Sequence, residues 1–216
     1  MKLRSTWLVL AVLIAALSSR PAVAGPIFGF EGGLSMSGLS GDDALFRGTR
    51  YGPAAGGYTQ LEFGSLLSVQ PELLFATKGG TTTSSGVDAQ GNPIGYFGTA
   101  TLQVSAIEIP VLLRVTPQIG GSVRPSFAVG PAFSFEMSEQ VRVGEPRSQT
   151  IDTNQLKNTD VGLTTGIALD FPRKSGFWRF DVRSNFGLLN IEEPTVGDNG
   201  IHNWNVVTMV GYGWRP

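Results

Sequence analysis

Apolar and small or polar residues alternate along residues 123–137, which read VRPSFAVGPAFSFEM. Every second position from Val123 to Met137 is apolar, and the positions between them carry Arg, Ser, Ala, Gly or Glu. Side chains of a β-strand point alternately to its two faces, so this period of two predicts a strand with one apolar and one polar face. The question it raises is whether the apolar face packs inward, as in a water-soluble barrel, or faces lipid.

The same alternation recurs about eight times, and short connections alternate with long ones rich in Gly, Ser, Thr, Asn and Asp. Tight turns at one end and long loops at the other are typical of outer-membrane barrels. The expected fold is therefore all-β, an eight-stranded antiparallel up-and-down transmembrane β-barrel. The expected strands are residues 27–38, 54–63, 67–78, 102–115, 123–137, 160–171, 177–190 and 203–214, with long loops at 39–54, 79–98, 138–159 and 191–202.

Two local features do not fit a regular ladder. Leu102 and Val104 are out of phase with the apolar positions that follow them, which predicts a β-bulge near Ser105 and Ala106. Proline cannot donate a ladder hydrogen bond, so prolines in the expected strands conflict with continuous pairing. They are Pro71, Pro110, Pro125 and Pro131.

Side-chain volume and the placement of aromatic residues favour an apolar face that meets lipid. The interior of an eight-stranded barrel is just filled by side chains, and the Phe, Leu, Ile and Val positions are too bulky for it. Trp204 and Trp214 are ten residues apart on one face, which spans roughly 25 Å at the usual strand tilt and matches an outer-membrane apolar band. The predicted aromatic girdle consists of Phe28, Phe63, Phe171, Trp178, Trp204, Tyr212 and Trp214.

The charged residues of the strands fall on the small-residue face. A charge on the lipid face would cost about 2–4 kcal/mol near the midplane, whereas charges of both signs can pair across a narrow lumen. The predicted lumen charge network consists of Glu31, Glu62, Glu72, Lys78, Glu108, Arg114, Arg124, Glu136, Arg179, Asp181 and Arg183.

The first residues resemble an export signal. Lys2 and Arg4 precede an apolar run, and Ala22-Val23-Ala24 forms an A-x-A cleavage site, so residues 1–24 are a predicted signal peptide and 25–216 the barrel domain. The remaining chain holds 13 basic and 17 acidic residues, which excludes a basic nucleic-acid-binding surface. It has no cysteine, so thiol catalysis, cysteine-based zinc sites and iron–sulfur clusters are excluded.

Several segments together resemble a known family. QPELLFATKGG, IEIPVLLRV, VRPSFAVGPAFSF, VGLTTGIAL and FGLLNI, in this order and spacing, are similar to the porin-family or PorT-like outer-membrane β-barrels. The most specific part is Glu108-Ile109-Pro110-Val111 followed by the Arg-Pro and Gly-Pro strand. The resemblance implies an eight-stranded barrel and little about activity. Such barrels usually end on an aromatic residue used for assembly, whereas here Arg215 and Pro216 follow Trp214.

Few residues of the sequence are candidates for catalysis or for binding a metal or cofactor. His202 is the single histidine, and no serine lies close to it on its strand, so an outer-rim residue is favoured over the base of a lipid A-modifying enzyme. Asp42 and Asp43 match no EF-hand loop, and no phosphate loop or dinucleotide fingerprint occurs. No catalytic residue, metal site or cofactor is predicted.

The expected protein is a non-enzymatic barrel in the outer membrane of a Gram-negative cell envelope. Its lumen is filled with side chains, and its loops serve a structural or surface-binding role. The expected partners are outer-membrane lipid including lipopolysaccharide, the barrel-insertion machinery and a surface ligand held by the loops, without nucleic acid. A narrow diffusion porin, a lipid A-modifying barrel enzyme and a lipocalin-like carrier remain as alternatives.

Overall fold

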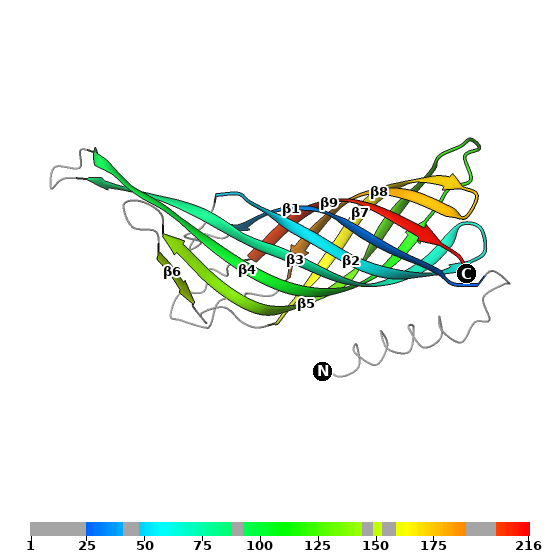
Figure 1. Cartoon of the computed structure of the whole chain (residues 1–216), viewed down its shortest axis with the longest axis horizontal. Helices are drawn as coiled ribbons and strands as arrows, with labels where there is room; N and C mark the ends of the chain where they lie inside the picture. The colour runs from blue at the N-terminus through cyan, green and yellow to red at the C-terminus, as the bar shows by residue number, and fades with distance from the viewer. Residues whose placement is uncertain (1–24, 41–47, 88–92, 144–148, 153–158, 189–201) are drawn as a thin grey trace.

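The chain forms a closed, tilted β-barrel (Figure 1). The computed structural model describes residues 25–40, 48–87, 93–143, 149–152, 159–188 and 202–216, so the predicted signal peptide lies outside the described residues. In this part of the chain no helix is long and apolar enough to cross a membrane. The strands are β1 (Ile27–Ser40), β2 (Arg50–Phe63), β3 (Leu67–Val87), β4 (Pro93–Val115), β5 (Arg124–Val143), β6 (Gln149–Asp152), β7 (Thr159–Arg173), β8 (Gly176–Gly187) and β9 (His202–Trp214).

Eight strands form the wall, and all their pairings are antiparallel. The sheet order is β4-β3-β2-β1-β9-β8-β7-β5-β6, and an additional pairing of β4 with β5 closes the ring. The short β6 pairs with the end of β5 beyond the wall. The predicted eight-stranded up-and-down barrel is therefore confirmed.

The short connections and the carboxyl end of the chain lie at one end of the barrel, and the long hairpins lie at the other (Figure 1). The β2–β3 turn is made possible by Gly64, whose φ of 78° lies in the left-handed region that glycine adopts without strain. The turns also bond to each other, since Gln118 donates to the Ser65 carbonyl at 2.7 Å. Short turns mark the periplasmic end of outer-membrane barrels, so the long hairpins point outward from the cell.

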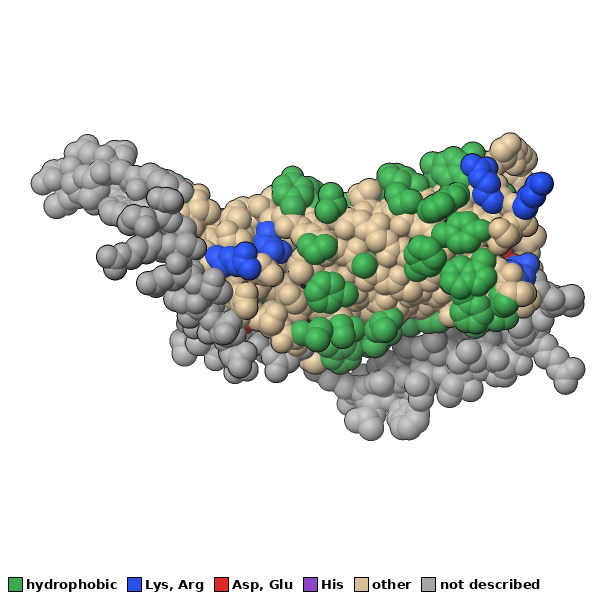
Figure 2. Space-filling view, in the orientation of Figure 1, with side chains coloured by type: hydrophobic (Ala, Val, Ile, Leu, Met, Phe, Trp, Pro, Cys, Tyr) green, Lys and Arg blue, Asp and Glu red, His purple; other side chains and the backbone are tan. Residues whose placement is uncertain are grey.

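The apolar side chains of the wall face outward, which answers the question raised by residues 123–137. Phe127, Phe133 and Phe135 are exposed on β5, whereas Ala128 and Ala132 between them are buried. Figure 2 shows hydrophobic side chains spread over the outer surface, with Lys and Arg toward its two ends. The small residues fill the interior because a lumen bounded by eight strands has little room for larger ones.

Three of the four predicted long loops, at 39–54, 79–98 and 138–159, prove to contain paired β-structure. In the first of them, β1 continues to Ser40 and β2 begins at Arg50. The β3–β4 hairpin continues through residues 79–87 and 93–98, and β5 continues to Val143 before pairing with β6. These stretches were predicted as loops because they are rich in Gly, Ser and Thr, and the apolar alternation of the wall does not extend into them. That alternation ends with the membrane, whereas backbone pairing does not depend on it.

The predicted bulge lies at the expected place for a different reason. Ser105 pairs with Ser138 and Ala106 pairs with Glu136, so Met137 of β5 is skipped. Leu102 and Val104 are buried, in phase with the inward positions of β4. The change of phase inferred for β4 was therefore wrong. The two residues are apolar because they close the outer part of the lumen.

The four conflicting prolines lie at interruptions or ends of the ladder. Each pairs on one side of its strand: Pro71 with Val111, Pro110 with Ala132, Pro125 with Leu169 and Pro131 with Leu163. The pairing with the neighbouring strand on the other side is interrupted at Pro71, Pro110 and Pro131. The interruptions lie between β2 and β3, β3 and β4, and β4 and β5, and beyond each one the pairing resumes in the same register. Pro125 lies beyond the last pair of β4 with β5. Proline has no backbone N–H to donate to the ladder. At these places the ladder is already interrupted or ended, so the absence of that donor removes no further ladder hydrogen bond.

Candidate functional site

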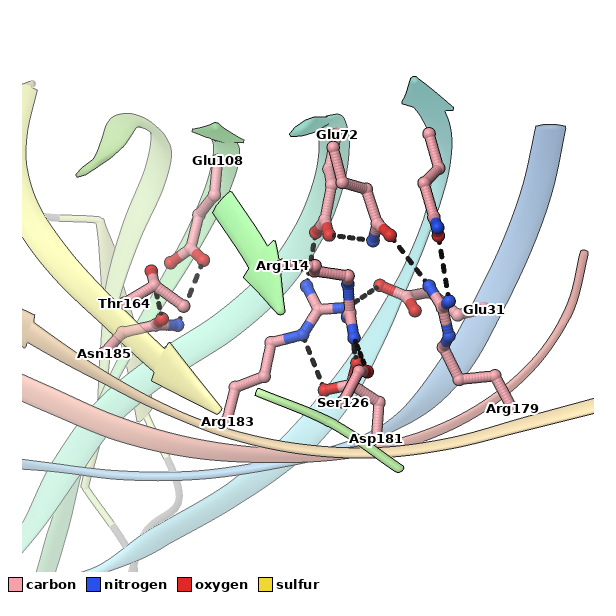
Figure 3. Close-up of polar contacts among 12 residues, drawn as sticks. Glu31, Glu72, Glu108, Arg114, Ser126, Thr164, Arg179, Asp181, Arg183 and Asn185 are labelled. Carbon is pink, nitrogen blue, oxygen red and sulfur yellow. Dashed lines mark hydrogen bonds and ion pairs between the residues drawn. The ribbon is translucent and has the colours of Figure 1, made fainter. Parts of the chain in front are cut away.

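The inner face of the barrel carries a connected set of buried charges, drawn in Figure 3. Alternation along each strand sends one side chain in two into the lumen, and the closed ring brings residues of distant strands together. Arg114, Arg179 and Arg183 are each 1% exposed. In so dry an interior a charge is tolerated only when it is paired and hydrogen-bonded.

Arg183 of β8 is the centre of this set. Its Nη2 donates to Glu31 Oε1 of β1 at 2.7 Å, and its Nε donates to Asp181 Oδ1 at 2.8 Å. Its Nη1 pairs with Glu72 of β3. One guanidinium thus joins three strands across the lumen and uses its fork of donors on three carboxylates.

The other two arginines extend the set toward the periplasmic end. Arg114 pairs with Asp181 and donates to Ser126 Oγ at 2.9 Å. Arg179 binds Asp170 through two bonds of 2.7 and 3.0 Å. It also donates to two amide oxygens, those of Gln70 at 2.8 Å and Gln60 at 3.0 Å.

Two apolar layers bound this charged layer. On the periplasmic side, Ile27, Tyr58 and Phe177 form a buried cluster. The guanidinium of Arg179 lies 4.9 Å from the ring centre of Tyr58 and 5.0 Å from that of Phe177, within the range of a cation–π contact. On the outer side, a second cluster contains Ala54, Leu74, Ala76, Val207 and Met209.

A smaller polar layer lies beyond the outer apolar cluster. Lys78 pairs with Glu108, whose other oxygen accepts from Asn185 Nδ2 at 3.5 Å. Thr164 donates to Asn185 Oδ1 at 2.6 Å. The cavity lined by these residues measures only about 20 Å³, roughly the space of one water molecule. The lumen is thus divided into layers of packed side chains.

The structure places the eleven charged residues singled out from the sequence in three environments. Glu62 lies at the periplasmic rim and pairs with Arg215, with side chains 30% and 41% exposed. Arg124 is exposed at the same rim, and Glu136 is partly exposed. The other eight are buried: Glu31, Glu72, Lys78, Glu108, Arg114, Arg179, Asp181 and Arg183.

Sequence reasoning missed several members of the buried set. Asp170 chelates Arg179, Gln60 and Gln70 accept from it, and Asn185 links Glu108 to Thr164. All of these residues stand at inward positions of their strands, so strand parity would have found them. The amides of Gln60, Gln70 and Asn185 were left out of the predicted network because it was limited to charged side chains. Asp170 was left out although its charge and its inward position both place it in the lumen.

The predicted girdle residues lie on the outer surface or partly exposed. Phe28, Trp178 and Trp214 are exposed, and Phe63, Phe171, Trp204 and Tyr212 are half-buried. Around Tyr212 the rings are in contact, with ring centres 5.3 Å from Trp178 and 6.5 Å from Trp214. Phe30, which was not predicted, lies 6.1 Å from Trp214 and joins this group.

The side chains weighed in the sequence for catalysis or metal binding fall outside what the structure describes. The side chain of His202 lies outside the described residues, as do Asp42 and Asp43. Within the described ranges no group of three or more His, Cys, Asp or Glu side chains is arranged to hold a metal ion. The chemistry visible in the lumen is charge pairing.

Comparison with known proteins identifies the architecture. Residues 20–193 match the family described as outer membrane protein beta-barrel domain. The structure resembles a major outer membrane protein from Thermus thermophilus, with a TM-score of 0.51, 16% identity, and coverage of 88% of this chain and 99% of that chain.

Two further solved outer-membrane proteins are similar to the chain. The outer membrane protease OmpT from Escherichia coli has a TM-score of 0.51 and 10% identity, covering 89% of this chain and 97% of that chain. The outer membrane protein OprG from Pseudomonas aeruginosa has a TM-score of 0.46 and 16% identity, covering 91% and 99%. At 10% and 16% identity, the likenesses to OmpT and to the Thermus thermophilus protein concern the fold alone. No curated protein matches the sequence.

Proposed function

The chain belongs to the outer membrane protein beta-barrel domain family, and from this premise we propose that it presents its outer hairpins to a partner at the cell surface. Its place is the outer membrane, where the barrel wall meets lipid. The β3–β4 hairpin carries the proposal. Among the side chains that the structure describes on β3, Phe75 is the last exposed large apolar one, yet the backbone of β3 continues to Val87. These twelve residues extend roughly 30 Å beyond the apolar band at the usual rise and tilt.

The outward-facing side chains of the wall change from apolar to polar at the level of Phe75. On β4 the outward positions below the transition hold Ile107 and Ile109, and those above it hold Ser105, Gln103 and Thr101. Side chains that can donate and accept hydrogen bonds thus replace hydrocarbon at these outward positions, where β4 still pairs with both β3 and β5. Beyond Ala100, β4 pairs with β3 alone and the two strands form a paired arm. A structural protein needs only short outer loops to close its barrel. A paired arm of this length supports a contact role.

The binding role can be tested with a photo-crosslinking amino acid at Thr83, which is exposed near the end of the described arm. In intact cells we expect Thr83 to form an adduct with one partner that is larger than lipopolysaccharide. The matched control is Ile119, which is 64% exposed in a periplasmic turn. It should not form the same adduct. A purely structural role would give lipopolysaccharide adducts alone at Thr83.

Shortening the arm gives a second test of the same proposal. Replacing residues 84–98 with Asn-Gly should join Thr83 to Thr99, which are already paired, through a favoured two-residue turn. The barrel should keep its heat-dependent shift in gel mobility because the lipid-facing wall is unchanged. Cells that carry this variant should lose the partner captured by the full-length arm. Retention of that partner would contradict a contact role for the arm.

The filled lumen argues against the alternative of a diffusion porin. Arginine side chains cross the lumen between apolar layers, and packed interiors of this kind leave no path for hydrated ions. In planar bilayers we expect no single-channel steps from the refolded barrel, whereas a general porin in the same bilayer conducts. Reproducible steps that change in size after Glu72→Gln would identify a route through the lumen and favour the porin.

We also propose that the protein is not an enzyme and that it is of the porin-family or PorT-like type. Five buried carboxylates pair with arginine or lysine rather than with a nucleophile or base, which supports the first statement; they belong to Glu31, Glu72, Glu108, Asp170 and Asp181. The Glu-Ile-Pro-Val strand supports the second. Lipopolysaccharide around the outer half of the wall and the insertion machinery acting on the last strand are the proposed partners in assembly. Unchanged lipid A in cells that express His202→Ala would fit a non-enzymatic role.

A further inference from the structure

A cationic pocket lies at the periplasmic end, opposite the hairpins. It has a volume of about 300 Å³, and its lining includes Arg124, Lys174, Ser175, Trp214 and Arg215. These residues come from β5, the β7–β8 turn and the end of β9, which the closed ring brings to one rim. Figure 2 shows Lys and Arg side chains gathered at this end of the barrel.

Positive charge exceeds negative charge in this rim pocket. Glu62 is the acidic residue of its lining, and it is already paired with Arg215. Among the described residues neither Arg124 nor Lys174 forms an ion pair with a carboxylate. Asp170 lies nearby, lining a neighbouring cavity, but both of its oxygens accept from Arg179. Two cations therefore remain to attract an anion.

Aromatic rings place the pocket at the level of lipid headgroups. Trp214 lines it, and Ser175 hydrogen-bonds to the Tyr212 hydroxyl at 3.1 Å. Tyr212 in turn contacts Trp178 and Trp214. Tryptophan and tyrosine gather where hydrocarbon gives way to headgroups, so the Trp214 side of the pocket lies at the level of the phosphates of the inner leaflet. The opposite side is lined from the lumen by Ile27, Phe177 and Arg124, so a headgroup would enter the pocket over the rim.

We propose that the rim pocket binds the phosphate of an anionic phospholipid in the periplasmic leaflet. The guanidinium of Arg124 can donate two parallel bonds to phosphate oxygens, and Lys174 supplies a mobile second charge from the turn. The acyl chains would then lie along the apolar wall on the membrane side of the girdle. Peptidoglycan also carries carboxylates near this end, but it would not need the adjoining aromatic rings.

Quenching of Trp214 fluorescence by brominated lipids tests the proposal. The chain has four tryptophans, one of them in the predicted signal peptide, so Trp178→Phe with Trp204→Phe leaves Trp214 as the single reporter in the exported barrel. The barrel is refolded in vesicles that contain brominated phosphatidylglycerol or brominated phosphatidylcholine. At low salt we expect phosphatidylglycerol to associate beside Trp214 about tenfold more tightly than phosphatidylcholine does.

The variant Arg124→Gln with Lys174→Gln should bring the two lipids to nearly equal association. The matched control, Arg50→Gln with Arg142→Gln, removes two positive charges at the other end of the barrel and should keep the preference. Raising the salt to about 0.5 M should weaken the preference for phosphatidylglycerol in the protein that keeps Arg124 and Lys174. This measurement needs no substitution in the rim pocket.

Two results would overturn the proposal. One is an equal preference for phosphatidylglycerol before and after Arg124→Gln with Lys174→Gln, in protein that keeps its heat-dependent gel shift. The other is a loss of co-sedimentation with purified peptidoglycan in that variant while the lipid preference stays unchanged. The second result would assign the pocket to cell-wall carboxylates. Neither result bears on the hairpin proposal, because the two sites lie at opposite ends.

Discussion

Arg183→Met is expected to lower the free energy of unfolding by about 3–5 kcal/mol. The guanidinium contacts Glu31, Glu72 and Asp181, all buried. Methionine fills similar space but leaves three carboxylates with less positive charge around them. Urea titration of the barrel in lipid vesicles, followed by tryptophan fluorescence, measures the effect.

A matched surface pair separates burial from ion pairing as such. Arg215→Gln breaks the pair with Glu62, whose side chains are 41% and 30% exposed, and should cost less than about 1 kcal/mol. Adding Glu31→Gln and Glu72→Gln to Arg183→Met should recover part of the loss, since the stranded charges are removed. Equal losses for Arg183→Met and Arg215→Gln would show that the lumen is wet.

Ile167→Arg should cost about 2–4 kcal/mol, because its side chain meets the middle of the membrane. Ile167 is 58% exposed on β7 and pairs with Val182 of β8. Val182 is four residues from Trp178 of the girdle, roughly 10 Å up the wall and close to the centre of a 25 Å band. Unfolding of the barrel in vesicles provides the measurement.

The control for this substitution is Ile119→Arg in a periplasmic turn. Ile119 is 64% exposed, as open as Ile167, but it lies outside the apolar band. Its replacement should change stability by less than about 1 kcal/mol. If Ile167→Arg were equally mild, its surroundings would be water, and the assignment of the phenylalanine-rich face to lipid would be wrong.

The wall of the barrel could be predicted from the sequence because its environment repeats every two residues. Lipid on one side and a narrow lumen on the other impose opposite demands on neighbouring positions, so Phe127 and Ala128 reveal their faces without any knowledge of partners. The strand count and the turns followed from the same signal. Above Phe75 lipid is absent, the signal stops, and the paired arms were mistaken for loops.

The pairings inside the lumen could not be predicted in the same way. Parity placed Arg183 and Glu72 on one face, but their contact joins residues 111 positions apart. Such a contact depends on the stagger of every strand between them and on closure of the ring. Leu102 and Val104 were misjudged for a related reason. An apolar residue on the inward face interrupts the apolar–polar alternation of a strand. From the sequence alone this cannot be told from a bulge that reverses the two faces.

The up-and-down order gives most strands a neighbour that is adjacent in the chain, whereas the seam between β1 and β9 unites the two ends of the domain. Each hairpin can form once its own two strands are available. The seam requires the whole polypeptide, so its formation has the greatest entropic cost of loop closure. The bond between Arg183 and Glu31 reaches over that seam from the penultimate strand. Its guanidinium therefore gains its full set of partners only at the final step of assembly, which favours completion of the cylinder over partly joined intermediates.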